Sequence, residues 1–102
     1  MSTEESNASG APELRYVRNP AILAASLGAD ELALLDAARG KYFGLNSPGM
    51  RIWELLETPK TLGELCETLV GEFAVDPAAC ARDTRELLAE MSAERIVLVE
   101  RG

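Results

Sequence analysis

The sequence predicts an α+β domain in which a three-stranded antiparallel sheet is followed by three helices. Three observations lead to this class. Short alternating segments fill residues 22–45, the hydrophobic period changes from 2 to 3.6 near residue 46, and amphipathic segments follow to about residue 94. With 102 residues, 47% of them hydrophobic, the chain has the size and composition of one soluble globular domain.

The first 21 residues offer little that a core could bury. Residues 1–13 are mostly small or polar and include three glutamates, so ordering them would cost backbone entropy without return, and we expect a disordered tail. Residues 14–21 are mixed, and Pro20 biases Asn19 toward an extended conformation, which predicts an extended lead-in rather than an element. The domain itself is expected over residues 22–102.

Three short strands joined by tight turns are expected next, as an antiparallel meander. In the second strand Leu32 and Leu34 alternate with polar or small residues, as expected when one face of a sheet is buried. Helix propensity opposes a strand at Ala24 and Ala25 in the first strand and at Glu31 to Leu35 in the second. The expected strands are residues 22–27, 31–36 and 41–45.

A first helix is expected from residue 46 onward. Asn46 or Ser47 can cap it, and Pro48 fits near its first position because the missing amide donor is not needed there. Apolar residues from Ile52 share one face, and the helix should end near residues 58–59.

Two further helices follow, and capping residues again mark where each begins. Thr61 and Glu64 have the spacing of a capping box, and Asp76 with Pro77 repeats the cap-plus-proline start. The short connection between them makes a helix-turn-helix, and with the preceding sheet the fold looks like a winged helix-turn-helix. Residues 96–99 form either a last short strand or a tail packed across the helices.

Composition excludes several classes of function. The chain has no histidine, which excludes His-based triads, His acid–base catalysis and metal sites that need imidazole. Its two cysteines, Cys66 and Cys80, provide neither a closed zinc site nor a disulfide framework, so a reducing cytoplasm fits best. No apolar run approaches the roughly 20 residues of a membrane-spanning helix. We therefore expect a cytoplasmic protein without metal, cofactor or membrane contact.

A helix-turn-helix suggests DNA binding, but the charges oppose it. The net charge is −7, and residues 61–94 carry eight carboxylates and only two arginines. Because DNA affinity depends on neutralising phosphates, a DNA-binding regulator is only the alternative hypothesis. No pair of carboxylates has a spacing that marks an acid–base couple, so we expect no enzymatic activity.

The segment Lys41-Tyr42-Phe43-Gly44-Leu45 has no structural explanation of its own. As the last strand of a meander it forms an edge of the sheet, and its glycine leaves room for another backbone. Such an edge can accept a peptide as an additional strand, with side pockets beside a neighbouring helix giving specificity. Alternatively, residues 14–21 or the C-terminal segment cover this edge.

A string of motifs carries a resemblance to a known family. They are the run from Leu34 to Asn46 with its Tyr-x-x-Leu-Asn end, Ile52-Trp53, Thr61 to Leu65, Phe73 to Pro77, and Asp83 with Leu87-Leu88. In their order and spacing over about residues 22–99, the chain resembles the PqqD-like family. These proteins are peptide chaperones, also called RiPP recognition elements, of pathways that make ribosomally synthesised and post-translationally modified peptides.

The resemblance implies a winged helix-turn-helix-like domain that binds the leader segment of a precursor peptide and has no catalytic activity. In the family, the leader adds as a fourth strand against the third strand and lies in a groove shared with the third helix. Carried over to this sequence, the strand part falls on Lys41, Tyr42, Phe43, Gly44 and Leu45, and the helix part on Ala81, Asp83, Arg85 and Leu88.

The resemblance also implies partners. A stand-alone domain would act in trans and present the precursor to processing enzymes, which are a leader peptidase and an ATP-dependent cyclase in the lasso-peptide branch and a radical enzyme in the pyrroloquinoline quinone branch. The Asp-x-x-x-Gly-x-Tyr run from Asp36 to Tyr42 looks more like the lasso branch. The acidic domain suits a leader that carries Lys or Arg, and its edge strand allows a monomer or a strand-paired dimer.

Overall fold

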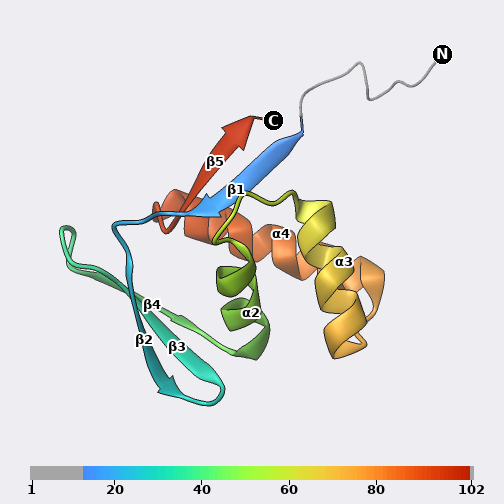
Figure 1. The fold of residues 1–102 in the computed structure, drawn as a ribbon, viewed down its shortest axis with the longest axis horizontal. Coiled ribbons are helices and arrows are strands. Elements are labelled where there is room, and N and C mark those ends of the chain that lie inside the picture. Colours follow the sequence, from blue (N-terminus) through green and yellow to red (C-terminus); the bar gives the residue numbers. More distant parts are fainter. Residues whose placement is uncertain (1–12, 102) are drawn as a thin grey trace.

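Five strands and three helices make up the part of the chain that the computed structural model describes, residues 13–101 (Figure 1). The predicted α+β class, with a three-stranded antiparallel sheet followed by three helices, is confirmed. The elements are β1 (Leu14–Arg18), β2 (Leu23–Gly28), β3 (Glu31–Asp36), β4 (Lys41–Leu45), α2 (Ser47–Leu55), α3 (Leu62–Phe73), α4 (Pro77–Ala93) and β5 (Val97–Arg101).

The three-stranded sheet has the order β2-β3-β4, so β4 lies at one edge, as predicted. Leu34 of β3 is opposite Phe43 of β4, and Leu32 is opposite Leu45. Leu34 is fully buried, Leu45 is buried and Phe43 is half-buried, which places the inner face of the sheet against the core. Tyr42, one residue away from Phe43, is 65% exposed on the outer face.

The prediction of a lead-in without an element is wrong for residues 14–18, which form β1. This strand pairs antiparallel with β5, with Tyr16 opposite Val99. The Tyr16 amide also donates to the Lys60 carbonyl at 2.7 Å, and the Lys60 amide donates to the Tyr16 carbonyl at 2.9 Å. Residues 14–18 become a strand because two distant segments supply hydrogen-bond partners that local sequence does not reveal.

The pairing of β1 with β5 answers two questions that the sequence left open: whether the C-terminal segment is a strand, and whether a terminal segment covers β4. The C-terminal segment forms a strand rather than a tail across the helices, and neither it nor residues 14–21 pairs with β4. The outer edge of β4 therefore has no strand beside it within residues 13–101. The disordered tail expected at residues 1–13 lies, apart from Glu13, outside the described residues.

The predicted helix caps are present. The Asn46 side chain accepts from the Gly49 amide at 3.3 Å, and Asp76 accepts from the Ala79 amide at 3.0 Å. Helix α2 ends at Leu55, earlier than expected, because the following residues turn so that Lys60 can pair with β1.

Helix α3 begins with a complete capping box, and this gives a testable contribution to stability. Thr61 Oγ1 accepts from the Glu64 amide at 3.1 Å, and Glu64 Oε1 accepts from the Thr61 amide at 2.9 Å. We expect Thr61→Ala to lower the free energy of unfolding by about 1 kcal/mol and Tm by about 4–8 °C in thermal denaturation. Thr68→Ala on the same helix, whose hydroxyl bonds only a carbonyl one turn back, is the control. Equal losses of Tm in the two variants would contradict a special role of the cap.

Contacts at both ends of β4 hold it in place beside the helices. At its C-terminal end a Cβ on Gly49 would lie 2.9 Å from Leu45 Cδ2, so only glycine lets α2 approach β4 this closely. At its N-terminal end Arg39 Nη1 donates to the Glu94 carbonyl at 2.9 Å, which ties the β3–β4 turn to the end of α4. These contacts set the position of β4 relative to α4.

Candidate functional site

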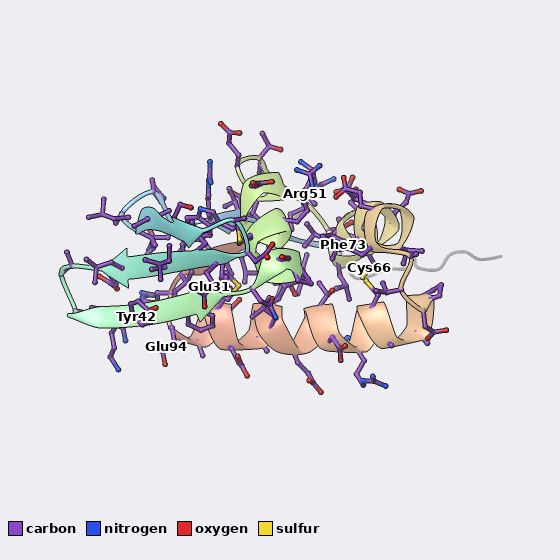
Figure 2. All side chains as sticks on the ribbon, turned by 90° about the horizontal axis from the view of Figure 1, so that it is seen from below. Glu31, Tyr42, Arg51, Cys66, Phe73 and Glu94 are labelled. Carbon is purple, nitrogen blue, oxygen red and sulfur yellow. The ribbon has the colours of Figure 1, made fainter. Side chains whose placement is uncertain are left out.

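The edge strand β4 and helix α4 form the two walls of a groove. The central pocket of this groove has a volume of about 420 Å³. Phe43, Gly44 and Leu45 line it from β4, and Leu87 and Glu90 line it from α4. In Figure 2, β4 lies beside α4, with Tyr42 and Glu94 near the same end.

Two further pockets adjoin the central one. The hairpin-end pocket, of about 440 Å³, shares Tyr42, Phe43 and Glu90 with it and extends to Glu94. The helical pocket has a volume of about 410 Å³ and shares Asn46 and Leu87 with the central pocket. We call these three adjoining pockets the β4–α4 groove.

The groove changes character along its length. Its helical pocket is mainly apolar and is lined by side chains from α2, α3 and α4 and from the α3–α4 connection, among them Ile52, Leu69, Phe73 and Val75. The helical pocket contains one carboxylate, Asp83, whereas the central pocket contains Glu31 and Glu90 and the hairpin-end pocket contains Glu90 and Glu94. An extended peptide lying in the groove would therefore meet more carboxylates beside β4 than in the helical pocket.

All five predicted residues of β4 line the groove. Lys41 lines the hairpin-end pocket, Tyr42 and Phe43 line both that pocket and the central one, and Gly44 and Leu45 line the central pocket. The ring of Tyr42 lies over Gly44, because a Cβ on Gly44 would be 3.5 Å from Tyr42 Oη.

The four residues predicted on the third helix are placed differently from one another. Asp83 lines the helical pocket. Leu88 is 1% exposed and belongs to the hydrophobic core, so its side chain does not reach the groove. Ala81 and Arg85 do not line any of the three pockets.

Leu87, Glu90 and Glu94 were not predicted as site residues, but they line the groove from α4 and its C-cap. With Asp83 they are spaced i, i+4, i+7 and i+11, so they share one face of the helix. This face adjoins the buried residues Cys80, Thr84, Leu88 and Met91. The spacing was visible in the sequence, but nothing in it showed on which flank of the buried stripe β4 would lie.

The two cysteines lie between α3 and α4, away from the β4 edge. Cys80 is buried, and its Sγ lies 3.8 Å from Thr84 Oγ1. Burial raises the pKa of the Cys66 thiol, which keeps this group protonated and a weak nucleophile near neutral pH.

The described residues provide neither a metal-binding cluster nor a membrane-spanning helix. No group of three or more Cys, Asp or Glu side chains could hold a metal ion within residues 13–101. In the same part of the chain, no helix is long and apolar enough to cross a membrane.

The chain is similar to one known family and to two solved structures. A family model described as coenzyme PQQ synthesis protein D (PqqD) matches residues 31–97, which include both β4 and α4. A solved structure described as TbiB1 in complex with the TbiA(beta) leader peptide is 33% identical, with a TM-score of 0.70, and the match covers 79% of this chain and 93% of that chain.

A second solved structure is described as lasso peptide synthetase B1 complexed with the leader peptide. It is 23% identical, with a TM-score of 0.69, and the match covers 81% of this chain and 96% of that chain. At this identity the likeness shows the shared fold alone. None of the curated proteins matches the sequence.

Proposed function

The chain belongs to the PqqD family, and we propose that it binds the leader segment of a ribosomally made precursor peptide in the β4–α4 groove. One observation carries this proposal: among the described residues the outer edge of β4 has no strand beside it, and this edge runs along a groove. A protein that is 33% identical and shares the fold is described in complex with a leader peptide, which supports the same role here.

Strand addition gives the binding its physical basis. A peptide beside β4 would form main-chain hydrogen bonds with the backbone groups that β3 leaves unused, and these provide affinity with little dependence on sequence. Its side chains would alternate between the groove, on the side of Phe43, and the outer face, on the side of Tyr42. Specificity would then come from the groove-facing side chains.

The role we propose is recognition without catalysis. Binding through a strand edge and a groove needs no metal, cofactor or activated nucleophile. The bound precursor would be presented to separate processing enzymes, and the run from Asp36 to Tyr42 supports a lasso-peptide pathway with a leader peptidase and a cyclase. The alternative, a DNA-binding regulator, is not favoured, because the exposed side of α4 in the groove carries Asp83, Glu90 and Glu94.

Direct titration tests the proposal. The probes are the TbiA(beta) leader peptide and synthetic leaders of precursor peptides encoded beside this gene, measured by calorimetry against the full chain. We expect at least one of them to bind with a Kd of about 1 μM or tighter, and a scrambled peptide of the same composition not to bind. Absence of binding by every leader would refute the proposed function.

A further inference from the structure

We propose that the β4–α4 groove selects leaders that place a lysine or arginine side chain toward α4, and that Glu90 is the residue that recognises this charge. The inference rests on the proposed function and adds to it the chemical class of the peptide. Its basis is the set of carboxylates that line the groove, not the apolar lining of the helical pocket.

Glu90 lies where it would contact a basic side chain of a bound peptide. It lines both the central and the hairpin-end pocket together with Phe43, so it is adjacent to a strand added along β4. Its side chain is exposed, and within residues 13–101 no hydrogen bond or ion pair of its carboxylate is found. Glu31, which lines the central pocket as well, likewise has no cationic partner among the described residues.

The cations close to the groove are already engaged. Lys41 Nζ lies 4.0 Å from Glu94 Oε1, and Arg39 Nη1 donates to the Glu94 carbonyl. At the helical pocket, Asp83 pairs with its neighbour Arg82 at 3.3 Å. Within the described part of the chain, Glu31 and Glu90 of the central pocket thus have no ion-pair partner, and the complementary group on a bound peptide is positively charged.

The geometry of an added strand defines where the basic residue lies in the leader. Side chains at every second position would face α4, and a long lysine or arginine stem can pack along Leu87 and Phe43 while its charged end reaches Glu90. The helical pocket, which begins at Leu87, accepts apolar side chains from the same face of the peptide. A selected leader should thus carry its basic residue an even number of positions from an apolar anchor.

Charge reversal at Glu90 tests the inference with whichever leader binds wild type most tightly in the titration above. An exposed ion pair contributes modestly to affinity, and reversal replaces that attraction by a comparable repulsion, so we expect Glu90→Lys to raise Kd about two- to thirtyfold. The difference should shrink between about 0.05 M and about 0.5 M salt. Glu67 is an exposed residue of α3 that lies outside the groove. Glu67→Lys changes the net charge by the same amount as Glu90→Lys, so the Kd of this variant should stay near that of wild type.

A complementary change in the peptide identifies the paired residue. Each lysine or arginine of the leader is replaced in turn by glutamate, and one replacement should weaken binding to wild type but restore binding to Glu90→Lys. Equal affinity of wild type and Glu90→Lys, equal effects of Glu90→Lys and Glu67→Lys, or a best-binding leader without any basic residue would overturn the inference and leave the proposed function standing. Failure of wild type to bind any leader would overturn both.

Discussion

Proline at one of two adjacent positions of β4 is expected to abolish leader binding while the protein stays folded. In an antiparallel pair, successive residues direct their amides alternately toward the partner strand and away from it. Of Tyr42 and Phe43, one therefore donates toward β3 and the other faces the open edge. Proline at the open-edge position removes a donor and places its ring against an incoming backbone, which should weaken binding by more than about a hundredfold.

The paired variants Tyr42→Pro and Phe43→Pro separate folding from binding. The variant that removes an amide donating to β3 should lose several degrees of Tm, whereas the other should keep its Tm and lose the leader in calorimetry. The opposite edge strand, β2, offers a matched control, because a proline at Ala24 or Ala25 that leaves Tm intact should also leave leader binding intact. If the variant that keeps its Tm binds the leader with wild-type affinity, the peptide uses another surface.

The second large effect is expected at Leu87, which, like Asn46, lines both the central pocket and the helical pocket. It is half-buried, so an aspartate there would place a charge where groove-facing apolar side chains of the leader have to lie. We expect Leu87→Asp to raise Kd by about thirtyfold or more, as for a truncated hot spot at the centre of an interface.

Two further variants make the Leu87 result interpretable. Ala89→Asp introduces the same charge on an exposed part of α4 that does not line the groove, and its Kd should change little. Leu87→Ala removes the contact without adding charge and should weaken binding to an intermediate extent in a variant that remains folded. If Leu87→Asp and Ala89→Asp have the same affinity and Tm, the leader does not cross the groove at this point.

Local signals in the sequence predicted the elements well, and capping shows why. Asn46, Thr61 and Asp76 each accept hydrogen bonds from amides only three residues ahead, so the start of each helix is determined within one turn of chain. The edge position of β4 was also predictable, because it follows from the short turns that join consecutive strands.

Long-range packing was not predictable in the same way. Leu14–Arg18 is a strand because of its pairing with β5 at the other end of the sequence. Leu87 and Leu88 both fit the apolar stripe expected for α4, yet only Leu88 is buried in the core, and Leu87 lies in the groove. Which of two neighbouring leucines faces the core depends on where the sheet packs against the helix, and this is a tertiary property.

The β1–β5 ribbon brings the two ends of the described chain together, since Leu14 is opposite Arg101 (Figure 1). A protein fused before residue 14 or after residue 101 would be attached at this ribbon. Such a fusion would not interrupt the sequence of β4 or α4. A reporter for peptide binding can therefore be attached at either end of the described chain, and in both cases it would lie at the same place on the molecule.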